Sequence, residues 1–128
     1  MHKVRNPASA VAPFGNYAQA VEAAAGLRWL YISGQVGVTP DGTTQDSFEA
    51  QSRAALRNLQ AILADAGMGF EDVLKLGVFV TSLERVADYR RVRDEFFGDL
   101  RVASTLLVVA GLARPEWQIE IEAVAAKA

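Results

Sequence analysis

The chain has 128 residues, a formal net charge of −2 and 51% hydrophobic residues. This length and composition are those of one ordinary globular domain, expected over residues 1–128, and they exclude a second core and a disordered body. Cysteine is absent, which excludes disulfides and thiolate chemistry, and the single histidine, His2, stands beside the N-terminus, where order is least expected. We therefore expect no metal site, no cofactor and no histidine base.

The N-terminal third predicts an irregular arm, two strands and a turn. Residues 1–16 hold two prolines and a Gly-Asn pair, which favour irregular structure. Residues 17–22 alternate weakly, as a strand does, and residues 27–33 are rich in aromatic and β-branched side chains. Gly34 is expected to interrupt this second strand, because a glycine lets another group approach the backbone closely. A Thr-Pro-Asp-Gly turn follows at residues 39–42.

A helix and a strand are expected in the middle of the chain. Asp46 and Glu49 match a capping box at a helix start. Apolar residues then recur at helical spacing as far as residue 66, and Gly67 stands where a helix commonly ends. Residues 73–80 are rich in β-branched side chains and have one apolar face, which indicates a strand.

A second helix and two strands complete the predicted order. Apolar residues recur at helical spacing over residues 83–97, with Arg93 inside the apolar stripe and Gly98 after the last turn. Strands are expected at residues 103–110 and 117–125. The class is α+β, and two helices can cover only one face of such a sheet. The other face is either buried by another subunit or left as a large apolar patch, which argues for an oligomer.

Two segments are distinctive: Ser-Gly-Gln at residues 33–35 and Ile-Glu-Ile-Glu-Ala at residues 119–123. Further matching segments occur in the same order along the chain, at Gly15–Val21, Asp72–Lys75, Arg93–Phe97 and Ala103–Thr105. Over nearly its whole length the chain resembles the Rid family of reactive intermediate deaminases, also known as the YjgF or endoribonuclease L-PSP type. This resemblance implies a chorismate mutase-like fold, with a mixed β-sheet and two helices on one face. It also implies a homotrimer with small-molecule clefts between neighbouring subunits.

The resemblance further implies a reaction and a set of site residues. The best-studied members of the family hydrolyse 2-imino and enamino acids and release ammonia, with an arginine gripping the substrate carboxylate. The family's catalytic glutamate falls at Glu120, and its cleft tyrosine and pocket-lining glycine fall at Tyr17 and Gly34. Each has a plain structural alternative: a solvated strand face for Glu120, an aromatic at a subunit edge for Tyr17, and a bulge or turn for Gly34.

The chain departs from the family at the arginine. Active deaminases carry Pro-Ala-Arg-Ser before the penultimate strand, and here Ser104 stands at the arginine position, within Val-Ala-Ser-Thr. A guanidinium holds a carboxylate with two charge-assisted hydrogen bonds, whereas a serine hydroxyl supplies one neutral donor. Hydrolysis of 2-imino acids is therefore expected to be weak or absent, with Ser104 and Thr105 donating hydrogen bonds to an altered substrate.

Other arginines are candidates for the missing cation. Arg101 lies three residues before the altered position. The second predicted helix offers Arg90, Arg91 and Arg93, of which Arg90 lies where many family members have asparagine. We include Arg90 among the candidate substrate-binding residues. The alternative for Arg90 is a surface pair with Asp94 at i,i+4, as for Arg91 with Glu95.

Three functions follow from these observations. The first is a hydrolase or deaminase of imine- or enamine-type intermediates, in which Glu120 orients or activates water. The second is a non-catalytic trimer that binds a small metabolite or regulates a partner. The third is an endoribonuclease, which the net negative charge and the lack of a basic stripe argue against, so no nucleic acid partner is expected. No apolar stretch is long enough to span a membrane and no secretory signal is visible, so we expect a cytoplasmic protein without a membrane partner.

Overall fold

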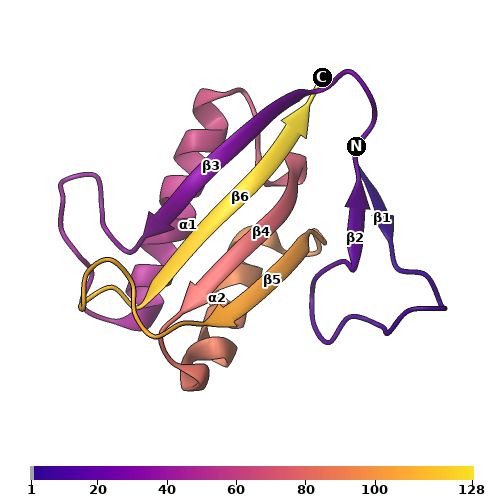
Figure 1. The fold of residues 1–128 in the computed structure, drawn as a ribbon. Helices are drawn as coiled ribbons and strands as arrows, with labels where there is room; N and C mark the ends of the chain where they lie inside the picture. Colours follow the sequence, from indigo (N-terminus) through magenta and orange to yellow (C-terminus); the bar gives the residue numbers. More distant parts are fainter. Residues whose placement is uncertain (1) are drawn as a thin grey trace.

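Four strands form a mixed β-sheet in the computed structural model, which describes residues 2–128 (Figure 1). Their order across the sheet is β3 (Arg28–Val36), β6 (Ile119–Lys127), β4 (Val73–Val80) and β5 (Ala103–Val108). β4 and β5 run parallel, whereas β6 is antiparallel to both of its neighbours. The prediction of a β-branched strand at residues 73–80 is confirmed at both ends.

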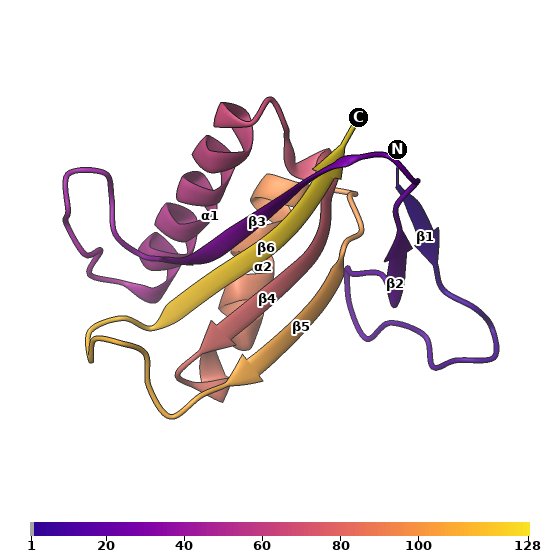
Figure 2. The same ribbon diagram turned by 45° about the horizontal axis from the view of Figure 1, so that its top comes forward.

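Both α-helices, α1 (Phe48–Asp65) and α2 (Val86–Phe97), pack on the same face of the sheet (Figures 1 and 2). Two short 3₁₀ turns, η1 (Phe70–Asp72) and η2 (Leu83–Arg85), precede β4 and α2. The core between helices and sheet consists of fully buried side chains: Leu56, Leu59, Leu63, Leu76, Val78, Tyr89, Val92, Ile119 and Ile121. The expected α+β class with two helices on one face is confirmed, and no helix within residues 2–128 is long and apolar enough to cross a membrane.

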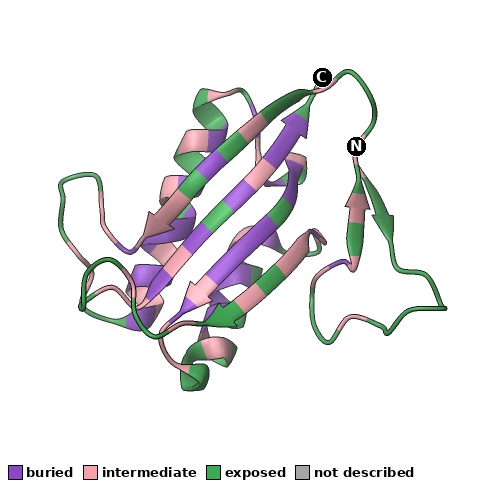
Figure 3. Ribbon diagram, in the orientation of Figure 1, coloured by how far each residue is buried: buried purple, intermediate pink, exposed green. Residues whose placement is uncertain are grey.

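The opposite face of the sheet carries no helix. Figure 3 views the sheet from this side: the two central strands are mostly buried, whereas the edge strands β3 and β5 are exposed or half-buried. Three large apolar side chains of the edge strands are open to solvent, with exposed fractions of 53% for Trp29, 76% for Tyr31 and 50% for Leu107. Because water contact with so much apolar surface is unfavourable, this face is suited to contact with another molecule.

A small antiparallel hairpin stands beside the main sheet and is made of β1 (Lys3–Arg5) and β2 (Ala20–Glu22) (Figure 1). The expectation of an irregular arm over residues 1–16 is therefore wrong for Lys3–Arg5, a strand too short to leave a pattern in the sequence. An ion pair of 2.6 Å between Arg5 and Glu22 joins the two strands. The Ala18 N–H donates to the Val102 carbonyl at 2.8 Å, which ties the chain before β2 to the start of β5.

Two local expectations need correction. The α1 N-cap is Ser47 and not Asp46, since the Ser47 hydroxyl accepts from the Ala50 N–H at 3.1 Å. The second predicted strand does not stop at the Ser-Gly-Gln triplet. Instead, β3 forms a β-bulge between Ile32 and Gln35 and continues to Val36. A bulge takes up one extra residue without ending the strand.

Candidate functional site

An open cavity of about 320 Å³ lies between α2, β5 and the loop before β2. Its polar lining consists of Tyr17, Tyr89, Arg90, Arg93 and Ser104. Its apolar lining consists of Phe14, Leu83, Val86 and Leu106. The cavity therefore brings together three of the residues singled out from the sequence, namely Tyr17, Arg90 and Ser104.

The alternation of β5 decides which of its side chains reach this cavity. Ser104 and Leu106 share the face that lies against α2, whereas Thr105 points to the open face. There the Thr105 hydroxyl oxygen accepts a hydrogen bond of 2.8 Å from Lys75 Nζ. The expectation that Ser104 and Thr105 serve one ligand side by side is thus not met within a single subunit.

Backbone hydrogen bonds shape the loop that supplies Tyr17. The Phe14 N–H donates to the Tyr17 hydroxyl oxygen at 3.0 Å, and the Tyr17 N–H donates to the Gly15 carbonyl at 2.9 Å. The loop is also joined to α2, because the Asn16 side-chain amide donates to Asp94 Oδ2 at 3.4 Å. These contacts fix the aromatic ring of Tyr17 at the cavity wall.

The two arginines of the cavity differ in their environment. Arg93 is 7% exposed and pairs with Asp94 at 3.0 Å, so its charge is compensated. Arg90 is exposed, and within residues 2–128 it forms neither a hydrogen bond nor an ion pair. Its Nε lies 4.0 Å from the position that a Cβ would take at Gly15, so the guanidinium extends over the loop beside the cavity. No carboxylate lines the cavity, which leaves it with one uncompensated positive charge.

The surface pairs expected along α2 do not form. Asp94 binds Arg93 in place of Arg90, and Glu95 pairs with Arg53 of α1 at 2.8 Å. Arg91 pairs instead with Asp88, one turn earlier in the helix. The prediction of pairs at i,i+4 is wrong because other cations lie closer to both carboxylates.

Tyr89 supplies a buried hydroxyl beside the arginines. The residue is 1% exposed, and its hydroxyl has no hydrogen-bond partner within residues 2–128. Burial raises the pKa of the Tyr89 phenol well above its usual value, and the nearby Arg93 charge offsets this shift only in part. The phenol therefore keeps its proton and remains a donor. A donor buried without a partner costs on the order of 1–3 kcal/mol.

Glu120 and Gly34 lie together on the other face of the sheet. Glu120 alternates along β6 with the buried Ile119 and Ile121, so its side chain points away from the helices. A Cβ on Gly34 would overlap the Glu120 carboxyl group, so any other residue at this position would displace that side chain. The bulge of β3 lies at this point. The bulge and the close approach of Glu120 together explain why residue 34 is a glycine.

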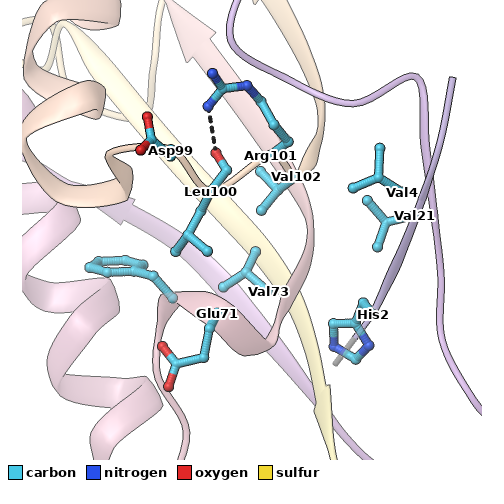
Figure 4. A pocket seen from close by; sticks show the side chains of 10 residues that line it. His2, Val4, Val21, Glu71, Val73, Asp99, Leu100, Arg101 and Val102 are labelled. Atoms are coloured by element: carbon cyan, nitrogen blue, oxygen red, sulfur yellow. Dashed lines mark hydrogen bonds between the residues drawn. The ribbon is translucent and has the colours of Figure 1, made fainter.

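A second cavity, of about 210 Å³, lies between the β1–β2 hairpin and the body of the domain (Figure 4). Arg101 lines it and donates to the carbonyl oxygens of Leu100, at 3.3 Å, and Gly98, at 3.4 Å. It therefore lies away from the Ser104 cavity and is not the replacement cation. His2 also lines this cavity, with its Nε2 3.0 Å from the Asp72 carbonyl oxygen. No serine, threonine or tyrosine hydroxyl accompanies it in the lining, so no nucleophile stands beside this imidazole.

One cavity residue, Tyr89, escaped the sequence reasoning, whereas Arg93 was considered only as one of three helix arginines. Both belong to the apolar stripe of the second predicted helix, which favours a core assignment. The available signal was the charge of Arg93 within that stripe, because an arginine is almost never fully buried without a partner. No cluster of three His, Asp or Glu side chains suited to a metal ion occurs in the part of the chain that the structure describes.

Comparison with known proteins places these features in a family. The family model described as Endoribonuclease L-PSP matches residues 7–127. A RutC family protein from Aquifex aeolicus is 31% identical over 99% of this chain and 100% of its own length. TdcF of Escherichia coli, named as a candidate reactive intermediate deaminase, is 29% identical over 99% of this chain and 98% of its own. The crystal structure of the Rid-family protein YyfB from Yersinia pestis has a TM-score of 0.85 at 30% identity, with 98% of each chain covered. The chain therefore belongs to the endoribonuclease L-PSP family, also called Rid or YjgF, and the resemblance is confirmed.

Proposed function

We propose that the chain forms a homotrimer whose intersubunit clefts hydrolyse small imine- or enamine-type intermediates and release ammonia. One observation carries this proposal. The family-matched residues fall into two half-sites on opposite faces of the sheet, Tyr17 and Ser104 beside α2, and Gly34 and Glu120 on the open face. Neither half is a complete site by itself. A second subunit that brings its open face to the α2–β5 edge completes one site, and a third copy can fill the two half-sites left over.

The arrangement of the half-sites favours a ring over a twofold dimer. A contact between two different patches is heterologous, and it closes on itself only as a cyclic ring. Each patch also carries exposed apolar side chains suited to a subunit contact. Tyr31 stands on the open face at 76% exposure, and Phe14 and Leu83 flank the α2 cavity at 78% and 74%. Three copies are the number that the family resemblance implies.

The proposed reaction requires few groups. A water molecule attacks the imine carbon while the Glu120 carboxylate passes one of the water protons to the imine nitrogen, which gives a neutral tetrahedral carbinolamine. The carboxylate then takes the hydroxyl proton and delivers it to the same nitrogen as the C–N bond breaks, so that ammonia leaves and a carbonyl product remains. Overall, one C=N group and one water become one C=O group and one ammonia. A base held in place contributes roughly 100- to 10,000-fold to such a step.

A glutamine scan of β6 tests this proposal. We expect a solution mass three times 13.8 kDa by light scattering, and accelerated loss of imines that an amino-acid oxidase generates in situ. Glu120→Gln should reduce that acceleration by about 100-fold or more. Glu122→Gln is the matched control, because Glu122 lies on the same strand face and is exposed. A monomeric protein, or equal losses in both variants, would refute the proposal.

A non-catalytic trimer that binds a small metabolite is the second candidate. It is favoured by Ser104, because a neutral hydroxyl supplies no charge where the family's active deaminases carry an arginine. Under this alternative a metabolite raises the melting temperature of the wild-type protein, while no imine is consumed and Glu120→Gln behaves as the wild type. Turnover of any imine that depends on Glu120 excludes it.

A further inference from the structure

We propose that Arg90 supplies, from helix α2, the carboxylate-binding guanidinium that strand β5 lacks at Ser104. The cleft would then select small substrates that carry a carboxylate, such as 2-imino acids, contrary to the expectation from Ser104 alone. This inference rests on the proposed function for the reaction, and it adds the substrate class and the residue that sets it. Its evidence is the charge, geometry and lining of the cavity beside α2.

The first argument is the unused charge of Arg90. Four arginines lie within residues 85–93, and three of them form ion pairs with Asp88 or Asp94. Arg90 alone among these four has no partner within residues 2–128, although Asp94 is at i,i+4 from it. A guanidinium beside a cavity without carboxylates is free to bind an incoming anion with two parallel hydrogen bonds.

The second argument is the geometry of the helix face. Arg90 and Arg93 stand at i,i+3, and Tyr89 and Arg93 at i,i+4, so all three lie along one side of α2. Asp94 engages Nε and one terminal nitrogen of Arg93, which leaves the other terminal nitrogen without a partner within residues 2–128. The Tyr89 hydroxyl is likewise unpartnered there. This wall of the cavity is therefore rich in donors and has a net positive charge, as an anion subsite requires.

The third argument concerns the shape and the remaining lining. A volume of about 320 Å³ lies at the lower end of the range for small-ligand pockets. Ser104 faces α2 from β5 and adds one hydroxyl, and the apolar rim formed by Phe14 and Leu83 suits a short hydrocarbon chain. A short carboxylate with an apolar substituent matches this set of groups better than a nucleotide or an uncharged imine.

The test compares a charged and a neutral probe on the full chain. The charged probe is 2-oxobutanoate, a stable keto acid, and the neutral probe is 2-oxobutanamide, which has the same skeleton without the carboxylate. Calorimetry should show tighter binding of 2-oxobutanoate to the wild type. Arg90→Gln should weaken 2-oxobutanoate by about 10- to 100-fold, as expected for a lost charged hydrogen-bond pair, and leave the amide unchanged. Arg91→Gln is the matched control, because Arg91 is on the same helix and pairs with Asp88 outside the cavity.

A relocated cation gives the sharpest check. The double variant Arg90→Gln with Ser104→Arg should regain the preference for 2-oxobutanoate over the amide, because the guanidinium then enters the same cavity from β5. Three results overturn the inference: an unchanged carboxylate-to-amide ratio in Arg90→Gln, an equal loss in Arg91→Gln, or Arg90-dependent binding of inorganic phosphate without binding of 2-oxobutanoate. An unchanged ratio with a less stable oligomer would mean that Arg90 serves the subunit contact.

The inference and the proposed function fail in different ways. Imine turnover that Arg90→Gln leaves unchanged for carboxylate substrates removes the inference and keeps the hydrolase. Arg90-dependent binding of 2-oxobutanoate without turnover of any imine keeps the carboxylate subsite and removes the hydrolase.

Discussion

Replacing Tyr89 with phenylalanine should stabilise the protein. The Tyr89 side chain is 1% exposed and its hydroxyl has no partner within residues 2–128, so the folded state leaves a desolvated donor unpaired. An unsatisfied buried donor costs about 1–3 kcal/mol, and the loss of the oxygen's packing contacts offsets part of the gain. We expect a net gain of about 1 kcal/mol in the free energy of unfolding, or roughly 3–5 °C in the melting temperature for a chain of this size.

The assay is urea unfolding at one fixed protein concentration, because the apparent stability of an oligomer depends on concentration. Tyr17→Phe is the contrasting variant. Its hydroxyl oxygen accepts a hydrogen bond from the Phe14 N–H at 3.0 Å, so its removal should cost about 1 kcal/mol. A loss of stability in Tyr89→Phe would refute the reasoning, because it would mean that a neighbouring subunit satisfies the buried hydroxyl.

Three further outcomes follow from individual contacts. Burial raises the pKa of the Tyr89 phenol, so the folded state favours its protonated form. This preference contributes to the free energy of unfolding in full below about pH 10, and the contribution is lost as the pH rises further, at up to about 1.4 kcal/mol per pH unit. Unfolding measured from pH 9 to pH 11 should show this slope in the wild type, and Tyr89→Phe should lack that part of it. Gly34→Ala should lower kcat/KM for imine hydrolysis at least about tenfold, because the new Cβ displaces the Glu120 carboxyl group from its position against β3. Gly111→Ala is the control and should leave kcat/KM unchanged, because a Cβ there meets nothing within 4 Å. Equal effects of the two variants would contradict the overlap between residue 34 and Glu120. Ser47→Ala should reduce the free energy of unfolding by about 1 kcal/mol and Asp46→Ala by much less, and the reverse order would restore the capping box expected from the sequence.

The parts of the fold that the sequence predicted are those with a long regular pattern. β4 and α2 carry eight and twelve residues of consistent periodicity. β4 was found where expected, whereas α2 ends at Phe97 as expected but begins at Val86, because residues 83–85 form a 3₁₀ turn. The three-residue strand β1 shows no such pattern, because its pairing with β2 depends on a contact across the fourteen residues 6–19 that connect the two strands. The bulge in β3 was predicted only as the alternative for Gly34, since a glycine marks a strand break or a bulge equally well in a sequence.

The candidate site was predictable in its members but not in its geometry. Tyr17, Arg90 and Ser104 were named from the sequence, and the structure brings them to one cavity. Glu120 lies on the face of the sheet opposite to Ser104. This placement depends on which face the helices cover, and residue types alone do not show which face that is. The buried stripe of α2 concealed Tyr89 for the same reason, because periodicity identifies a packed face without showing where that face opens into a cavity.

A serine at the position where the family resemblance implies an arginine does not by itself determine the electrostatics of the proposed cleft. The field inside a cavity is the sum over all charges that line it, and here α2, β5, η2 and the loop before β2 contribute to the lining. A guanidinium at the end of a long side chain reaches the same volume from α2 as from β5, because the two elements form opposite walls of one cavity. Under the carboxylate inference, the unpaired Arg90 on the helix therefore takes the part that the family resemblance implies for a cation at the Ser104 position. A consequence is that Ser104→Arg in the otherwise wild-type chain should bring two like charges into one small cavity. That variant should lose stability in low salt, and it should recover when the salt concentration is raised or 2-oxobutanoate is added.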